Sequence, residues 1–302
     1  MKKKYLYIFP FLIILGIVIP FTLSMADLND IKSTLEVFKS RPENIVHNRK
    51  APVNDTAAST ELATRIENGV SSAVGTPSPP SAKPQVKNLS IPILMYHEIG
   101  DGPSSLYVSE NNFRAQMHYL RSNGYTIVTM NQAREMLVNK QIPPKVAVIT
   151  FDDGYVSIYN RAWPILEECA FPATVYVCSS FPGLYNYLTW DHIKLLHSGG
   201  VEIGSHSHTH PALTAVNPTA LTQEISGSKQ ILEQKLGTKV YSFCYPTGAY
   251  NENTPKVIKN AGYTSAVTVK FGKATSQNDL YLLPRIRVFK ADTISTFAKN
   301  IQ

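Results

Sequence analysis

The 302-residue sequence has little of what identifies several common protein classes. Its three cysteines, Cys169, Cys178 and Cys244, are too few and too scattered for a disulfide framework or a cysteine-rich zinc site. Because two of these cysteines lie in apolar runs, we expect them to be free thiols that pack as small buried apolar residues. The net charge of +7 comes without a long Lys/Arg block or a nucleic-acid-binding motif. These absences exclude a specific nucleic-acid reader, and the charge favours attraction to anionic surfaces such as a cell wall.

Aromatic residues are also scarce between residues 27 and 88, where Phe38 is the only one. This stretch ends in a segment rich in proline and serine. Such a composition buries too little apolar area to offset the conformational entropy of the chain. We therefore predict that residues 27–88 form an extracytoplasmic linker that is largely disordered.

The first 26 residues have the pattern of an export signal. Lys2, Lys3 and Lys4 precede the uncharged apolar residues 5–23. This stretch is close to the length that spans a bilayer, about 20 residues. A cleaved signal peptide and a retained membrane anchor fit residues 1–26 equally well. Both place the rest of the chain outside the cytoplasm, because the lysines stay inside.

From residue 89 onward, short β-rich runs alternate with helical patterns. The expected strands are residues 93–96, 126–129, 146–150, 174–178, 201–205, 241–245, 265–269 and 281–288. This alternation predicts an α/β fold, a distorted (β/α) barrel of seven or eight parallel strands. In such barrels the chemistry lies at the C-terminal ends of the strands. We expect residues 89–302 to be the catalytic domain of a monomer.

Two adjacent carboxylates, Asp152 and Asp153, follow the third expected strand and precede Gly154. Neighbouring carboxylates repel each other unless a cation or a proton separates their roles. A metal resolves this conflict if one Asp binds the metal and the other stays free as a base. A simple Asp-Asp-Gly turn is the alternative.

Three histidines in five residues, His206, His208 and His210, follow another expected strand. His206 and His210 can converge on one ion, and two imidazoles with one carboxylate make a catalytic metal set. A surface run of histidines would be the alternative. A further histidine, His97, ends the first expected strand and could act as an acid near neutral pH. A hydrogen-bonded structural histidine would fit that position too.

The motifs Thr-Phe-Asp-Asp-Gly at 150–154, Ser-His-x-x-x-His-Pro at 205–211 and Tyr-Pro-x-Gly at 245–248 resemble those of the polysaccharide deacetylases, carbohydrate esterase family four (the NodB homology domain). The opening Met-Tyr-His run resembles the branch of exopolysaccharide, or poly-N-acetylglucosamine, deacetylases. The resemblance extends over residues 91–288.

This resemblance implies a role for each matching residue. Asp152 would be the general base and His97 the general acid, and Asp153, His206 and His210 would bind one divalent metal. Zinc is expected from the ligand types, while Co²⁺, Ni²⁺ or Fe²⁺ would fit the same set. Three further positions carry weaker implications for the substrate or the oxyanion: Thr247, Trp190 and Arg285.

The sequence departs from the commoner family members at two positions. An arginine that braces the base in those members is replaced here by Cys244, and Arg285 is our candidate for the same task. Thr247 stands where an aromatic residue is usual, and it keeps only a backbone N–H for the oxyanion. For Trp190, a place in the core is as compatible with the sequence as a place beside the substrate.

We therefore expect a metal-dependent hydrolase that removes acetyl groups from an N-acetylglucosamine-type polysaccharide of the cell wall or an exopolysaccharide. The expected location is extracytoplasmic, either anchored by the N-terminal segment or secreted to the cell wall. An O-acetyl polysaccharide esterase and a catalytically silent wall-binding module are the alternatives. A free base beside the metal argues against the binding module, because binding alone has no use for it.

Overall fold

The computed structural model describes residues 89–302, so the export segment (1–26) and the linker (27–88) lie outside the described residues. None of the helices in the described part is long and apolar enough to cross a membrane. Eight parallel strands form the main sheet: β1 (Ile93–Tyr96), β4 (Thr126–Val128), β5 (Val146–Phe151), β6 (Thr174–Val177), β7 (Glu202–Ser205), β8 (Ser242–Cys244), β9 (Ser265–Phe271) and β10 (Leu283–Arg287). The eight strands expected from the sequence are therefore all present.

Seven of these strands close into a barrel in the order β1-β10-β9-β8-β7-β6-β5, and β5 pairs again with β1. The eighth strand, β4, pairs only with the first part of β5, from Val146 to Val148. On the same edge, strand β1 pairs with the remaining residues of β5, up to Phe151. The expected seven or eight strands are thus seven in the barrel and one outside it.

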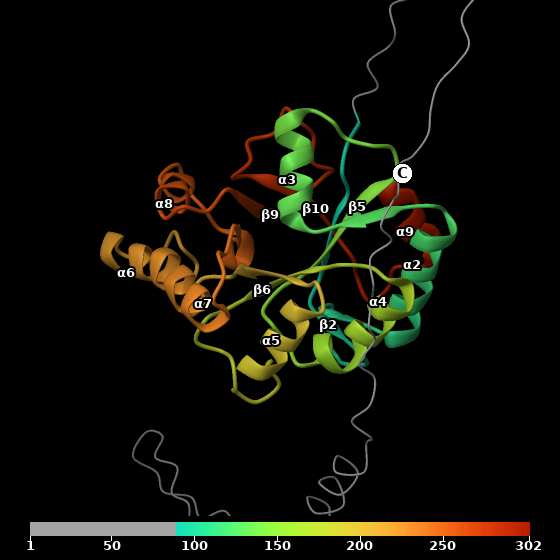
Figure 1. The fold of residues 1–302 in the computed structure, drawn as a ribbon, viewed down its shortest axis with the longest axis horizontal. Coiled ribbons are helices and arrows are strands. Elements are labelled where there is room, and N and C mark those ends of the chain that lie inside the picture. Colours follow the sequence, from blue (N-terminus) through green and yellow to red (C-terminus); the bar gives the residue numbers. More distant parts are fainter. Residues whose placement is uncertain (1–88) are drawn as a thin grey trace, which may run out of the picture. The chain divides into compact units, whose positions relative to one another are not determined.

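Helices and helical turns connect the strands and lie around them (Figure 1). They are α2 (Glu110–Ser122), α3 (Met130–Asn139), η1 (Ile158–Ala162), α4 (Trp163–Cys169), α5 (Trp190–Ser198), α6 (Pro218–Thr222), η2 (Gln223–Gly227), α7 (Ser228–Leu236), η3 (Pro246–Gly248), α8 (Thr254–Asn260) and α9 (Ile294–Ile301). A small two-stranded sheet, β2 (Glu98–Ile99) with β3 (Tyr107–Val108), follows β1. Ser109 caps α2 by accepting a hydrogen bond from the Asn112 N–H.

Side chains of β5 alternate between the two faces of the barrel wall, as strand geometry requires. Ala147, Ile149 and Phe151 belong to the larger core cluster, which also contains the helix residues. Val146 and Val148 belong to the second cluster. The same alternation turns the side chain of Asp152, the next residue in this series, toward the barrel axis.

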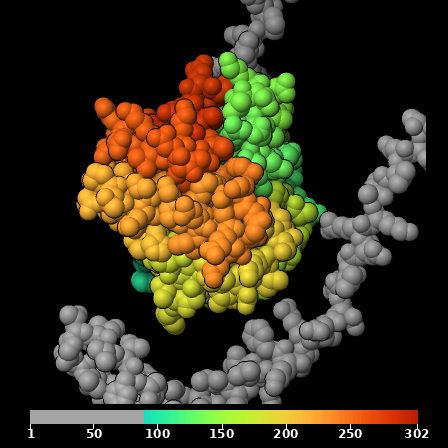
Figure 2. Space-filling view, turned by 60° about the vertical axis from the view of Figure 1, so that its left-hand side comes forward, coloured from blue at the N-terminus to red at the C-terminus, as the bar shows by residue number. Residues whose placement is uncertain are grey.

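Helix α3 covers the end of the barrel at which the strands begin. The Met130 N–H donates to Thr174 Oγ1 over 2.9 Å, and the Asn131 N–H donates to Glu202 Oε2 over 2.7 Å. Thr174 and Glu202 are the first residues of β6 and β7, so α3 sits below the strands. Figure 2 shows the green segment that contains α3 beside the orange-red segment leading to β10.

The barrel interior above α3 is filled by large side chains. The ring of Tyr176 is fully buried and faces Gly204 on the neighbouring strand, where a Cβ atom would lie 2.5 Å from the ring. Only glycine leaves space for that ring at position 204. With this end filled, the opposite end, where the strands finish, is left for a functional site.

Candidate active site

Asp152 and Asp153 leave the end of β5 in different directions because the chain turns there. The Asp152 N–H still donates to the Tyr96 carbonyl over 2.9 Å, which continues the barrel pairing. Asp153 takes a left-handed conformation with φ of 70°, and Gly154 follows with φ of 79°. Left-handed backbone is uncommon for residues other than glycine and is typical of functional sites. The turn therefore separates the two carboxylates, whose roles the sequence also separated.

The carboxylate of Asp153 meets two of the three histidines from the loop after β7. Its Oδ1 lies 3.3 Å from His206 Nε2 and 3.3 Å from His210 Nε2. The three ligand atoms all lie within 4.8 Å of one another. Burial opposes ionisation of Asp153, but hydrogen bonds with both histidines outweigh it and hold its pKa well below the usual range. This carboxylate and two imidazoles therefore form a preorganised set of the type that binds a divalent metal.

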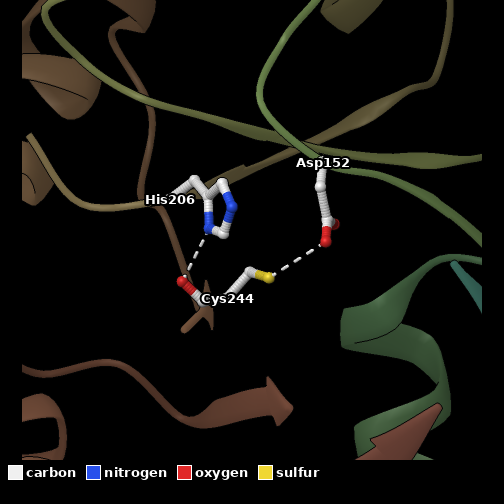
Figure 3. A group of neighbouring side chains, drawn as sticks. All are labelled: Asp152, His206 and Cys244. Carbon is white, nitrogen blue, oxygen red and sulfur yellow. Dashed lines mark hydrogen bonds between the residues drawn. The ribbon is translucent and has the colours of Figure 1, made fainter. Parts of the chain in front are cut away.

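A second hydrogen bond orients His206 for that role. Its Nδ1 lies 2.8 Å from the backbone carbonyl of Cys244, at the end of β8 (Figure 3). Because a carbonyl only accepts, Nδ1 must carry a proton, so Nε2 is the nitrogen that can bind a metal once it gives up its own proton. His208, by contrast, places its Nδ1 2.8 Å from Ser179 Oγ. The donor chemistry and the fixed tautomer fit a metal such as zinc.

Asp152 is held by the guanidinium of Arg285 through two hydrogen bonds of 2.7 Å, one to each carboxylate oxygen. Burial raises the pKa of Asp152, but the Arg285 charge and these hydrogen bonds outweigh it, so the net pKa is lowered. Arg285 also donates to the Thr268 carbonyl and to Thr150 Oγ1. Asp152 is thereby kept ionised in a site where burial alone would protonate it.

The sequence analysis grouped Arg285 with residues that could contact the substrate or the oxyanion, but its place in the structure is different. Its side chain is fully buried, and it does not line the cavity described below. It therefore acts behind Asp152, as the candidate replacement for the missing arginine at position 244. Cys244 is buried as predicted, yet its surroundings are polar. Its Sγ lies 3.5 Å from Asp152 Oδ2 (Figure 3). The same sulfur lies 3.2 Å from Arg285 Nη2. The apolar run around Cys244 conceals this, because side chains alternate along a strand.

His97 follows β1 directly and lies near Asp152. Its Nε2 is 4.0 Å from Asp152 Oδ2, and its side chain is 15% exposed. Burial lowers the pKa of His97, and the nearby carboxylates of Asp152 and Asp153 offset this only in part. His97 thus faces the same cavity as the two carboxylates without joining the group of three metal-binding side chains.

A cavity of about 240 Å³ opens at this end of the barrel. Its lining residues are Met95, His97, Leu106, Asp152, Asp153, His206, His210, Tyr245, Thr247, Val269 and Arg287. Five residues predicted from the catalytic and metal-binding motifs therefore meet in one cavity together with Thr247. Thr247 belongs to η3 and has a left-handed φ of 57°.

Trp190 is not among these lining residues. It is the first residue of α5, is partly buried against the larger core cluster, and lies under Lys235 Nζ, which is 5.6 Å from its ring centroid. Of the two places that the sequence leaves open for Trp190, the packing favours the core. Arg287 and Tyr245, in contrast, line the cavity although sequence reasoning did not select them.

Sequence reasoning also missed Glu224, which is hydrogen-bonded to the loop that carries His206, His208 and His210. Its Oε2 accepts hydrogen bonds from the N–H groups of His208 and Thr209, both 2.8 Å, and its Oε1 accepts from Thr209 Oγ1 over 2.5 Å. Glu224 lies in η2, a π-helical turn between α6 and α7. Such turns are frequent at functional sites. A glutamate in a polar helix carries no sequence signal for this contact.

We expect Glu224→Gln to weaken divalent-metal affinity by about 10- to 100-fold, because an uncharged amide forms weaker hydrogen bonds to the loop N–H groups than a carboxylate does and holds the loop between the two histidines less firmly. Competition with a chromogenic chelator would measure the affinity. Glu233→Gln is a matched control: Glu233 accepts from the Val240 N–H but contacts no residue of the loop. If both variants bind metal as tightly as the unmodified protein, Glu224 does not position the ligands.

Comparisons with known proteins point to one family. A family model described as polysaccharide deacetylase matches residues 139–266. YxkH of Bacillus subtilis, whose name places it among the polysaccharide deacetylases, is 34% identical over 217 residues, or 72% of this chain and 77% of that protein. The poly-beta-1,6-N-acetyl-D-glucosamine N-deacetylase of Staphylococcus aureus is 25% identical over 195 residues, or 60% of this chain and 67% of that protein. The solved structure of the Streptococcus pyogenes deacetylase PplD in complex with acetate is 29% identical and matches with a TM-score of 0.69, over 72% of this chain and 100% of that chain.

Proposed function

Because the chain belongs to the polysaccharide deacetylase family and is therefore a deacetylase, we propose that it removes N-acetyl groups from an N-acetylglucosamine-type polysaccharide and releases acetate. The observation that carries this proposal is the separation of two carboxylates in one cavity. Asp153 faces His206 and His210, while Asp152 is held apart by Arg285. One carboxylate is thus committed to a metal and the other is available to take a proton.

Each residue has a task that follows from its position. A divalent ion held by Asp153, His206 and His210, for which zinc is our proposal, would act as a Lewis acid on the acetamide and make an attacking water more acidic. Asp152, kept ionised by Arg285, accepts the proton of that water. His97 donates a proton to the departing amine, which is a poor leaving group until it is protonated. The Thr247 N–H is our proposed donor to the developing oxyanion.

The substrate proposal is tested by measuring acetate release from a panel of purified polymers. The panel contains poly-N-acetylglucosamine, chitooligosaccharides, peptidoglycan glycan strands and an O-acetylated xylan. We expect release from N-acetylated polymers. Release only from the xylan would make the protein an O-acetyl esterase instead, which is the alternative that the sequence left open.

The metal proposal predicts that the double variant His206→Ala/His210→Ala loses tight divalent-metal binding, because one carboxylate cannot hold the ion alone. Elemental analysis after dialysis would measure the metal content, with about one ion per chain expected in the unmodified protein. His208→Ala is the matched control, since its ring contacts Ser179 rather than Asp153. Full metal content in the double variant would contradict the assignment.

We further propose that the enzyme acts outside the cytoplasm, as a monomer that is either anchored in the membrane or secreted to the cell wall. The basis is the sequence of residues 1–26, with its lysines and uncharged apolar run. Fractionation of cells that express the full chain would test this. Recovery with the cytoplasmic proteins would contradict it.

A further inference from the structure

Arg287 lines the catalytic cavity but has no role in the steps above. It is the last residue of β10 and pairs with Met95 of β1, two residues before His97. Two residues earlier on the same strand, Arg285 points into the barrel. Because strand side chains alternate, Arg287 points to the same side, one level closer to the cavity mouth. Its guanidinium carbon lies 5.1 Å from the centroid of the Phe289 ring.

The two arginines differ in their hydrogen-bond and ion-pair partners. Arg285 donates to Asp152, Thr150, Thr268 and Cys244. Arg287, in contrast, forms no ion pair with a carboxylate of residues 89–302, and its buried Nε has no hydrogen-bond partner there. A buried donor without a partner costs about 1–3 kcal/mol, so such groups call for an explanation.

The charge of Arg287 also opposes the proposed proton donor. It contributes to lowering the pKa of His97, and the carboxylates of Asp152 and Asp153 act the other way. The hydroxyls of a neutral sugar could accept from the Arg287 N–H groups, but they would leave its positive charge unbalanced. A donor without a partner and an opposing charge are expected at a position where a bound ligand supplies the missing partner.

We propose that Arg287 binds an oxyanion group, a carboxylate or a phosphate, that the glycan carries close to the acetamide under attack. This inference rests on the proposed function and narrows its substrate to an anionic N-acetylated polymer. A planar guanidinium with free N–H donors matches both groups, and hydrogen bonds between charged partners are stronger than those to sugar hydroxyls. The chain's net charge of +7 favours the same polymers.

The test compares three oligosaccharides of equal length with the full-length, metal-loaded protein. One is an N-acetylglucosamine oligomer, the second carries a 3-O-lactyl carboxylate on alternate sugars, and the third carries phosphate groups. We expect wild type to prefer one or both charged glycans in kcat/KM for acetate release. In Arg287→Gln that preference should fall by roughly 10- to 100-fold, mainly through KM, because a charge-assisted hydrogen bond is lost. Arg287→Lys should restore part of it.

Lys299→Gln is the control for net charge, since Lys299 is an exposed residue of α9 and does not line the cavity. It should keep the wild-type preference. The charged glycan whose preference disappears in Arg287→Gln identifies the group that is bound. A wild-type protein without any preference, or an Arg287→Gln variant that loses equally on all three glycans, would overturn the inference.

Binding of the same glycans, measured by calorimetry, decides the matter independently of turnover. Tighter binding of a charged glycan that depends on Arg287 supports the inference, whereas equal affinities for charged and neutral glycans overturn it. If no glycan releases acetate, the proposed function fails, and the calorimetric comparison still settles the role of Arg287.

Discussion

A His97→Ala variant is expected to retain its metal and to lose about 10²- to 10⁴-fold in the rate of amide deacetylation, as is typical when an acid–base catalyst is removed. His97 lies 4.0 Å from Asp152 and outside the group formed by Asp153, His206 and His210. The loss should depend on the leaving group. The phenolate of an activated aryl acetate leaves without being protonated, so the variant should hydrolyse this ester nearly as fast as wild type.

Asp152→Asn provides the comparison, because a base is needed for both substrates. We expect it to keep its metal and to lose activity on the amide and on the aryl ester alike. Acetate release, aryl-ester hydrolysis and metal content are measured for both variants. Equal losses on the two substrates in His97→Ala would mean that His97 orients the site rather than acting as the acid. Loss of metal in that variant would make His97 a ligand.

An Arg285→Met variant is expected to lose about 3–5 kcal/mol of its free energy of unfolding at neutral pH, because it leaves the buried Asp152 carboxylate unpaired. The pH dependence should also change sign. In wild type, Arg285 lowers the folded-state pKa of Asp152. The pair therefore adds stability above the unfolded pKa of about 3.9, and this is lost as the pH falls through the folded pKa. Without Arg285, burial raises that pKa, so the variant should gain stability as the pH falls through the raised value.

Urea unfolding of the metal-free protein at several pH values would measure this. The double variant Arg285→Met/Asp152→Asn is the matched control, since it removes both charges. It should recover most of the lost stability and lack the inverted pH dependence. A loss below about 1 kcal/mol in the single variant would contradict the view that Arg285 sets the ionisation of Asp152.

Most of the barrel strands were predictable because they are short, largely apolar runs next to a turn. Parallel strands buried on both faces read in this way, and the run at 146–151 is wholly buried. The position of β4 outside the barrel was not predictable. It depends on competition between β1 and β4 for one edge of β5, and that competition has no local sequence signal.

For the site, it was predictable that Asp152, Asp153, His206, His210 and His97 would line one cavity, because each follows the end of a barrel strand. Long-range contacts were harder to foresee. Arg285 is 133 positions from Asp152. It was a candidate partner of Asp152 only because Cys244 replaces the arginine that is usual in the family. Glu224 and Arg287 have no sequence signal, because an acid on a helix and a base on a strand most often face solvent.

The filled lower barrel affects how the enzyme treats a long polymer. Helix α3, Tyr176 and Arg285 close the interior below the catalytic groups, so acetate has no exit through the barrel axis. It must leave through the mouth by which the glycan entered. If the bound polymer covers this mouth, it has to lift or shift after each turnover before acetate escapes. We then expect free amines scattered along the glycan rather than in unbroken blocks.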